Sequence, residues 1–260
     1  MDLLGLSKPF IGVIHLPPLP GAPGHCGERL QAIVERAASD ATALAAGGAD
    51  AAIVENFGDA PFARIVSAET TAAMAILVSE VHRRTSLRLG VNVLRNDGVA
   101  ALGIAAAADA AFIRINVFCG SAVTDSGWVD GTPRRLIELR RRLGATVAIL
   151  ADVHVKHAAH FNSLEEAALD ASRNGADALI VTGAATGHAP SPEDVSRVKA
   201  SGRLPVVAGS GITEGTVSAF AHADGFIVGS TLHCGGDIMQ PVDATRVRRV
   251  AEAIAALRTT

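Results

Sequence analysis

The most informative segment of the sequence is Gly48-Ala49-Asp50-Ala51-Ala52-Ile53-Val54, because three variants of it follow along the chain. The variants span residues 107–113, 175–181 and 222–228, and each leads from a helix-like, alanine-rich stretch into β-branched or aromatic residues. This order predicts the end of a helix, a tight turn with an aspartate at its polar corner, and then a buried strand.

Four more strands are predicted, one before the first copy and one between successive copies, at residues 10–15, 87–93, 147–153 and 205–208. Eight near-continuous apolar strands that alternate with helices favour a parallel sheet covered on its outer face. In 260 residues they predict an α/β fold with a single (β/α)8 TIM barrel of the phosphate-binding type, spanning residues 1–260. The main alternative is an open doubly wound sheet, but no Gly-x-Gly-x-x-Gly turn follows the first strand. The aspartates of the four copies would lie at the N-terminal face of the barrel, where a structural role is expected.

The composition limits the possible partners. The formal net charge is -3 and the chain has one tryptophan and no tyrosine, so neither a basic field nor a stacking surface for a nucleic acid polymer is expected. No apolar run reaches the roughly 18–20 residues of a membrane-spanning helix, and no cationic leader opens the chain. These features predict a cytoplasmic protein that forms a homo-oligomer through outer helices, while peripheral association with a membrane stays open.

Three scattered cysteines, Cys26, Cys119 and Cys234, argue against a disulfide framework. Two of them form His-Cys pairs with His25 and His233, in loops that would be neighbours in a closed barrel. A zinc site there is geometrically conceivable, but separate unreactive thiols are favoured.

Polar side chains end several predicted strands, and in a barrel these ends share one pocket. Burying an unpaired ionisable group is costly, so such residues are expected where they have a function. The residues in Arg114-x-Asn116 and in Asp152-x-His154-x-Lys156 have period 2, so each set is expected to point inward. The predicted catalytic residues are Glu55, Arg114, Asp152, His154 and Lys156, and the predicted substrate-binding residues are His15, Asn56, Asn92, Asn116 and Thr182. A layered salt-bridge network of Arg114, Asp152 and Lys156 is the structural alternative.

Two turns are predicted to bind phosphate. Gly209-Ser210-Gly211 follows the seventh strand and Gly229-Ser230 follows the eighth, where barrels often hold phosphate groups. Glycines let backbone N–H groups approach an anion closely, and a helix N-terminus adds its positive dipole end. Two ordinary tight turns are the alternative.

Several chemistries are compatible with these residues. Glu55, Asp152, His154 and His15 offer ligands that suit Mg²⁺, Mn²⁺ or Zn²⁺, although no compact ligand motif is present. Without a metal, Glu55 or Asp152 is the candidate general base, and His154 or Lys156 is the candidate acid or carbonyl polariser. A Schiff base on Lys156 is a further option.

Residues 118–133 are expected to form a long loop rich in Gly, Ser and Asp. Trp128 within it is expected to cover a bound ligand or to contact another subunit. The basic run Arg134–Arg142 is expected to be an exposed helix face.

Several segments resemble the BtpA/SgcQ family, and together they span essentially the whole chain. They are GVIHLPPLPG at 12–21, IVENFGDAPF at 53–62, GVNVLRND at 90–97, FIRIN at 112–116, ADVHVKHA at 151–158 and GSG at 209–211. Many relatives carry Gly-Thr-x-x-Lys after the last strand, whereas this chain has Gly229-Ser230-Thr231-Leu232-His233. The change removes a permanent positive charge beside the predicted phosphate site.

The resemblance implies a phosphate-binding barrel with one of two functions. SgcQ-like members are similar to proteins found alongside sugar uptake and metabolism, and a nucleotide phosphatase activity has been suggested for them. This favours an enzyme acting on a small phosphorylated metabolite, a sugar phosphate or a nucleotide, as an isomerase, a lyase or a metal-assisted phosphate hydrolase. BtpA-like members are associated with photosystem I biogenesis, which implies instead a non-catalytic assembly factor for a membrane complex.

Overall fold

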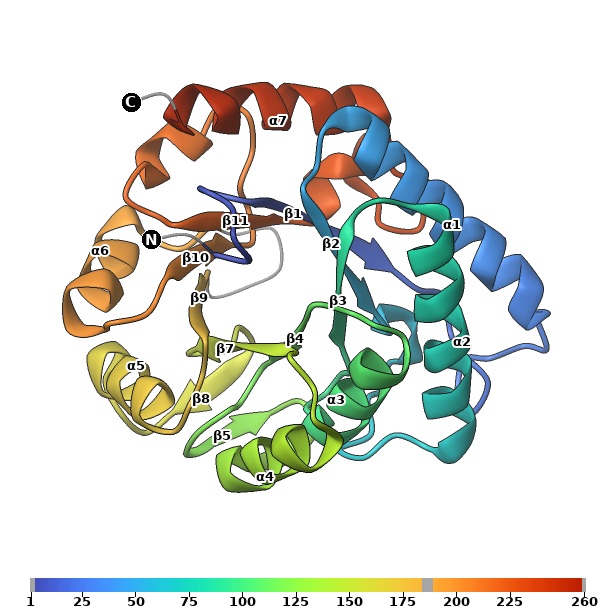
Figure 1. The fold of residues 1–260 in the computed structure, drawn as a ribbon, viewed down its shortest axis with the longest axis horizontal. Helices are drawn as coiled ribbons and strands as arrows, with labels where there is room; N and C mark the ends of the chain where they lie inside the picture. The colour runs from blue at the N-terminus through green and yellow to red at the C-terminus, as the bar shows by residue number, and fades with distance from the viewer. Residues whose placement is uncertain (1–2, 184–188, 259–260) are drawn as a thin grey trace.

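The computed structural model describes residues 3–183 and 189–258, and its eight parallel strands close into a barrel ringed by helices (Figure 1). The predicted TIM barrel is therefore confirmed. Residues 1–2, 184–188 and 259–260 of the predicted 1–260 unit lie outside the described residues. The barrel strands are β1 (Phe10–His15), β2 (Ala51–Glu55), β3 (Arg88–Asn92), β4 (Phe112–Ile115), β7 (Ala148–Val153), β9 (Ala178–Thr182), β10 (Val206–Gly209) and β11 (Gly225–Val228).

Helices follow most of the strands and cover the barrel, with α7 packed against α1 where the ring closes (Figure 1). The α-helices are α1 (Leu30–Gly47), α2 (Ala68–Arg84), α3 (Gly98–Ala107), α4 (Pro133–Leu143), α5 (Leu164–Arg173), α6 (Pro192–Ser201) and α7 (Ala244–Arg258). Short 3₁₀ segments are η1 (Phe57–Asp59), η2 (Val217–Phe220), η3 (Ser230–Leu232) and η4 (Cys234–Gly236). The connection from β10 to β11 thus contains η2 in place of a full helix. No described helix combines the length and the apolar character that a membrane crossing requires.

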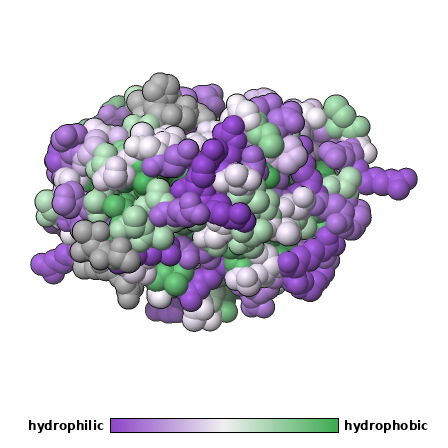
Figure 2. Space-filling model, turned by 90° about the horizontal axis from the view of Figure 1, so that it is seen from above, coloured by the Kyte–Doolittle hydropathy of each residue, from purple (hydrophilic) through white to green (hydrophobic). Residues whose placement is uncertain are grey.

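Strand side chains alternate between two cores, as a period of 2 requires. Ile53, Phe112, Leu150 and their inward neighbours fill the barrel, while the outward residues pack beneath the helices. Gly90 makes room for Phe112, because a Cβ at Gly90 would lie 2.2 Å from that ring. On the face of the molecule seen in Figure 2, hydrophilic side chains are spread between the apolar ones.

Three of the four repeat aspartates have the predicted structural role at the N-terminal face. Each accepts a hydrogen bond from the backbone N–H of a strand that lies beside its own. The bonds run from Phe10 to Asp50 (2.8 Å), from Ile149 to Asp177 (2.8 Å) and from Val206 to Asp224 (2.9 Å). Asp109 differs, because its backbone is in the left-handed region at φ 53°.

The long loop predicted at 118–133 contains two strands that were not expected. The segment forms a hairpin of β5 (Ser121–Thr124) and β6 (Gly127–Asp130), and β5 also pairs antiparallel with β8 (Ala158–His160) after β7. This three-stranded sheet lies at the barrel mouth, over a small core that contains Ala122 and Val129. The basic run behind it forms α4, in which only Leu136 is buried, so the predicted exposed helix face is confirmed.

Replacing Asp224 with alanine is expected to lower the free energy of unfolding by about 1–3 kcal/mol, because the buried N–H of Val206 loses its acceptor. Urea unfolding measures the change. Glu193→Ala, at an exposed position in the first turn of α6, is the control and should change stability by less than about 0.5 kcal/mol. Equal effects of the two variants would contradict the structural role of Asp224.

Candidate active site

Four inward-facing side chains end neighbouring strands at the C-terminal face of the barrel. His15, Glu55, Asn92 and Arg114 are successive partners in the parallel register of β1, β2, β3 and β4. Residues paired in register are neighbours across adjacent strands, so the four inward side chains form one continuous row along the inner wall of the barrel.

Arg114 of this row forms a buried bidentate ion pair with Asp152 of β7. Arg114 Nε donates to Asp152 Oδ1 and Nη2 donates to Oδ2, both at 2.9 Å. Asn116 Nδ2 also donates to Asp152 Oδ2 at 2.9 Å. These three hydrogen bonds hold the Asp152 carboxylate in place, and the carboxylate in turn orients Arg114.

Glu55 lies beside this pair, with its Oε2 3.9 Å from Arg114 Nη1 and its side chain 9% exposed. Burial raises the pKa of the Glu55 carboxyl above its ordinary value, against the opposing charges of Arg114 and Lys156. The described residues donate no hydrogen bond to its carboxylate. A buried carboxyl with a raised pKa and free lone pairs is suited to act as a general base.

Lys156 lies three residues beyond the end of β7 and faces the same space. Burial and the nearby Arg114 charge lower the pKa of the Lys156 ammonium, although Glu55 and Asp152 oppose the shift. Its ammonium group forms neither a hydrogen bond nor an ion pair within 4 Å in the described part of the chain. The Lys156 ammonium can therefore donate to a ligand without first breaking a hydrogen bond to the described residues.

A small cavity of about 50 Å³ lies between these charged side chains and the two glycine–serine turns. The cavity is lined by the side chains of His15, Glu55, Arg114 and Lys156, and by the turn residues Ser210, Gly211, Gly229 and Ser230. The backbone turns sharply after β10, with φ of 70° at Ser210 and 62° at Gly211. A Cβ at Gly229 would lie 3.2 Å from the His15 ring, so glycine allows that ring to approach the turn.

A second cavity of about 330 Å³ adjoins the first and shares Glu55, Arg114 and Lys156 with it. Phe62 and Arg95 line its outer part, where the Arg95 guanidinium lies 5.1 Å from the centre of the Phe62 ring. Arg95 Nε also donates to Asp125 Oδ1 at 2.9 Å, which ties the hairpin tip to the barrel mouth. A volume above about 300 Å³ is typical of a small-molecule site.

A chain of hydrogen bonds determines the tautomer of His15. His233, which is fully buried, has Nδ1 2.7 Å from the Gln240 carbonyl oxygen and Nε2 3.1 Å from His15 Nδ1. Because a carbonyl oxygen can only accept, a neutral His233 ring carries its proton on Nδ1, and its Nε2 then accepts a hydrogen bond from His15 Nδ1. His15 Nε2 then presents a lone pair beside Gly229. Burial, with the charges of the neighbouring groups, lowers the pKa of His15 to about 3, so the ring is neutral.

Comparison with known proteins identifies the chain's relatives. The model of the BtpA family matches residues 6–256. The chain belongs to the BtpA family. It is 46% identical to the Pyrococcus horikoshii protein PH1209, over 97% of this chain and 98% of that protein. It is 43% identical to the photosystem I biogenesis protein BtpA of Synechocystis, over 95% of this chain and 88% of that protein.

Solved barrels share the fold of this BtpA-family chain at low sequence identity. One is (S)-3-O-geranylgeranylglyceryl phosphate synthase from Thermoplasma acidophilum, in complex with its substrate sn-glycerol-1-phosphate. The two chains superpose with a TM-score of 0.62 and 18% identity, over 98% of each. At this identity the likeness concerns the fold alone.

The structure brings most of the predicted site residues of this family member together. The small cavity collects His15, Glu55, Arg114, Lys156, Ser210, Gly211, Gly229 and Ser230, and the larger one adds Asn116. Gly209 ends β10 directly before the first turn. Asp152 takes part through Arg114.

Asn56 and Asn92, which are predicted to bind substrate, form hydrogen bonds to neighbouring loops and strands. Asn56 is fully buried, donates to Asp59 at 2.8 Å and accepts from the Leu94 N–H at 2.7 Å, so it joins the loops after β2 and β3. Asn92 donates to the Arg114 carbonyl oxygen at 3.0 Å. Its Oδ1 is the buried side-chain atom without a partner in the described structure, but Asn92 lines neither cavity.

The prediction that His154 continues the inward row of Asp152 is wrong. β7 ends at Val153, and His154 adopts a left-handed φ of 59°, which breaks the period of 2. His154 therefore lines another cavity, where Nε2 lies 3.3 Å from Asn162 Oδ1. Thr182 lines neither central cavity and donates to the His154 carbonyl oxygen at 3.4 Å.

The predicted site residues did not include four groups that shape the site: Phe57, Phe62, Arg95 and His233. Arg95 follows the third strand closely, so its place among the strand ends was an available signal. His233 was considered with Cys234 and as the residue that replaces the lysine of many relatives, but not as a hydrogen-bond partner of His15.

The proposed metal ligands do not fit a metal centre. No three His, Cys, Asp or Glu side chains of the described residues cluster closely enough to hold an ion. Asp152 already accepts three hydrogen bonds from Arg114 and Asn116, and His154 lines a different cavity from Glu55. Cys26 and Cys234 are separate exposed thiols, and Cys119 is half-buried.

The tautomer of His15 can be tested directly by NMR. In long-range ¹H–¹⁵N spectra, the His15 ring should be neutral and protonated on Nδ1, and it should stay so through the ordinary histidine titration near about pH 6.5. The signal lost in His15→Asn identifies the ring. His233→Phe removes the partner of His15 Nδ1, so the His15 ring should no longer be restricted to the Nδ1-protonated form. A wild-type His15 that is protonated on Nε2, or that titrates normally, would contradict the hydrogen-bond chain.

Proposed function

We propose that the chain is an enzyme that acts on a small phosphorylated metabolite by acid–base chemistry at the barrel mouth. The observation that carries the proposal is the small cavity, where two glycine–serine turns meet Glu55 and Lys156. Both side chains are free of hydrogen bonds to the described residues. The shared fold of a synthase whose structure holds sn-glycerol-1-phosphate supports a phosphorylated substrate.

The phosphate group would accept hydrogen bonds from the backbone N–H groups of the turns at 210–211 and 229–230, with Lys156 contributing positive charge. The rest of the ligand would extend into the larger cavity over Glu55 and Arg114. The lone pair of His15 Nε2 would accept from a ligand hydroxyl or from a protonated phosphate.

In the proposed reaction Glu55 removes a proton from a carbon next to a carbonyl group. The electron pair left on that carbon moves to the carbonyl oxygen, where Lys156 and Arg114 stabilise the negative charge. Return of the proton to a neighbouring atom gives an isomerase, and loss of a leaving group gives a lyase. Asp152 acts in this scheme by holding Arg114 in place.

Glu55→Gln tests the proposed base. Incubation with sugar phosphates and nucleotides in D₂O should exchange a carbon-bound proton of the substrate in the wild type, and the variant should slow the exchange by about 10²–10⁴-fold. ¹H NMR measures the exchange. Glu138→Gln, exposed on α4, is the matched control. Unchanged exchange in Glu55→Gln would remove Glu55 from the mechanism.

The pH profile of kcat/KM should be bell-shaped. Activity should rise with pH as Glu55 loses its proton, with a midpoint above the ordinary 4.5 because the pKa of Glu55 is raised. It should fall again as Lys156 deprotonates, with a midpoint below the ordinary 10.5 because that pKa is lowered. Lys156→Met should abolish the alkaline limb, and a limb that persists in this variant would assign it to another group.

The name of the Synechocystis relative favours a second candidate, a non-catalytic factor in the biogenesis of a membrane complex. Thermal unfolding with a panel of phosphorylated metabolites separates the two. An enzyme's ligand at a hundred times its Kd should add about 2.7 kcal/mol of stability and raise Tm by roughly 5–10 °C. The shift should shrink in Lys156→Met. A panel without any shift would favour the second candidate.

A further inference from the structure

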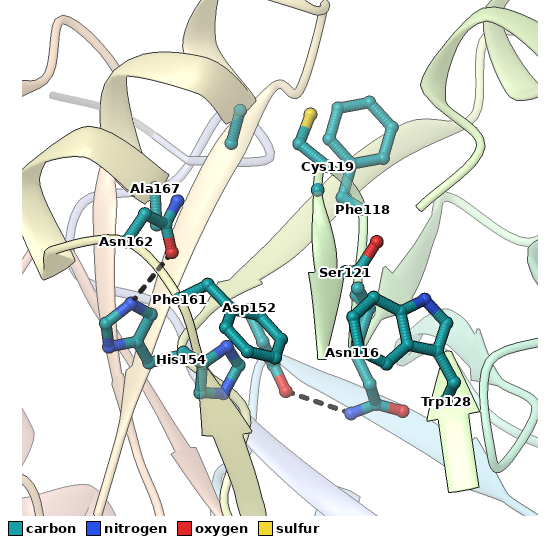
Figure 3. Close-up of a pocket in the computed structure, with 14 residues that line it drawn as sticks. Asn116, Phe118, Cys119, Ser121, Trp128, Asp152, His154, Phe161, Asn162 and Ala167 are labelled. Carbon is teal, nitrogen blue, oxygen red and sulfur yellow. Dashed lines mark hydrogen bonds between the residues drawn. The ribbon is translucent and has the colours of Figure 1, made fainter. Parts of the chain in front are cut away.

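A third cavity, of about 380 Å³, opens beside the central site (Figure 3). Asn116 and Asp152 lie at its base, joined by their hydrogen bond. One wall comes from the segment after β4 and its hairpin, and the other comes from the segment between β7 and α5. Asn116 also lines the larger central cavity, so the two spaces adjoin.

Two exposed aromatic rings flank this third cavity. Trp128 is 49% exposed and Phe161 is 68% exposed, and their ring centres lie 5.3 Å apart at an angle of 32°. Figure 3 shows the two rings close together at one side of the space. Trp128 is the chain's one tryptophan, and it lies at a cavity instead of in the core. Adjacent exposed aromatic side chains indicate a surface that binds something.

The aromatic pair is held in place. Trp128 Nε1 donates to Asp130 Oδ1 at 2.8 Å, and its carbonyl oxygen accepts from Arg64 at 3.1 Å. Phe161 directly follows β8, which pairs with β5 of the same small sheet as Trp128. The pairing of the three strands therefore sets the spacing of the rings before any ligand binds.

The third cavity differs from the central one in its charged groups. No lysine or arginine is among the described residues that line it, Asp152 is neutralised by Arg114, and the other titratable groups of its lining are His154, His160 and Cys119. Burial lowers the pKa of His154 and raises the pKa of the Cys119 thiol to about 12, so both are uncharged near neutral pH. Such walls suit an uncharged flat group, whereas an anion is better held beside Lys156.

One polar group at the wall adds selectivity. Asn162 Oδ1 is paired with His154 Nε2 at 3.3 Å, which leaves the amide nitrogen of Asn162 to donate to a ligand. A heteroaromatic ring can accept that hydrogen bond through a ring nitrogen or a ring carbonyl, and a plain aryl ring cannot.

We propose that the third cavity binds the planar heteroaromatic ring of a phosphorylated ligand, stacked on Trp128 and Phe161. The presence of a phosphate group on the ligand rests on the proposed function, whereas the ring site is inferred from the geometry of the third cavity. The substrate class becomes a phosphate ester that carries a heteroaromatic ring, in place of a bare sugar phosphate.

The fluorescence of Trp128, the one tryptophan, reports on this site directly. Adenosine and uridine supply a ring without phosphate, their monophosphates supply both, and ribose 5-phosphate supplies phosphate alone. Nucleosides and monophosphates should quench the fluorescence, and ribose 5-phosphate should not. Phe161→Leu should weaken nucleoside binding by roughly 5- to 100-fold, since stacking on an aromatic side chain contributes about 1–3 kcal/mol per base.

Controls separate the two ends of the ligand. Lys156→Met should weaken the binding of the monophosphates and of ribose 5-phosphate but leave nucleoside quenching unchanged. Leu143→Ala, at an exposed position at the end of α4, should change neither the binding nor the quenching. Nucleoside quenching without any stabilisation by ribose 5-phosphate would support the ring site and contradict the proposed phosphate site.

Two results would overturn the ring proposal. One is the absence of quenching by any nucleoside or monophosphate, and the other is an unchanged nucleoside affinity in Phe161→Leu. Phenyl phosphate tests the role of Asn162, because it should bind more weakly than uridine monophosphate. Equal affinity would overturn the preference for a heteroaromatic ring.

Discussion

The buried ion pair between Arg114 and Asp152 organises the barrel mouth. Removing one partner of such a pair leaves an uncompensated charge at a cost of about 3–5 kcal/mol, so the two side chains hold each other in a single geometry. Asn116 adds a third hydrogen bond to the carboxylate. Because this pair satisfies its own charges, Glu55 and Lys156 remain without hydrogen bonds to the described residues, and they are the groups left to meet a ligand.

Barrel closure determines which chemistries become neighbours. The register of β1 to β4 places His15, Glu55, Asn92 and Arg114 in one row across neighbouring strands, and the turns after β10 and β11 complete a cavity with charged walls. The sheet of β5, β6 and β8 adds a second compartment, which has aromatic walls and no lysine or arginine among its described lining residues. The mouth is therefore divided by polarity, which suits a ligand that is anionic at one end and flat and uncharged at the other.

Membership of the BtpA family establishes the relatives of the chain, whereas the likeness to solved barrels concerns the backbone alone. The pair of His15 and His233 lies beside the glycine–serine turn that follows β11. A neutral histidine with a lone pair on Nε2 accepts hydrogen bonds, whereas a lysine donates them. The group that this part of the cavity recognises should therefore carry a proton.

The barrel and the inward direction of its polar strand ends were readable from the chain, because hydrophobic period and turn residues are local signals. Asp50, Asp177 and Asp224 illustrate this, since each repeats the same corner before a strand. The sequence did not show which side chains and which strands would pair with each other. Which carboxylate Arg114 would hold, and that β8 would join a hairpin far upstream, depend on groups that only folding brings together. The left-handed backbone of a single residue, His154, moved its ring to a different cavity, and neither composition nor periodicity specifies such a torsion angle.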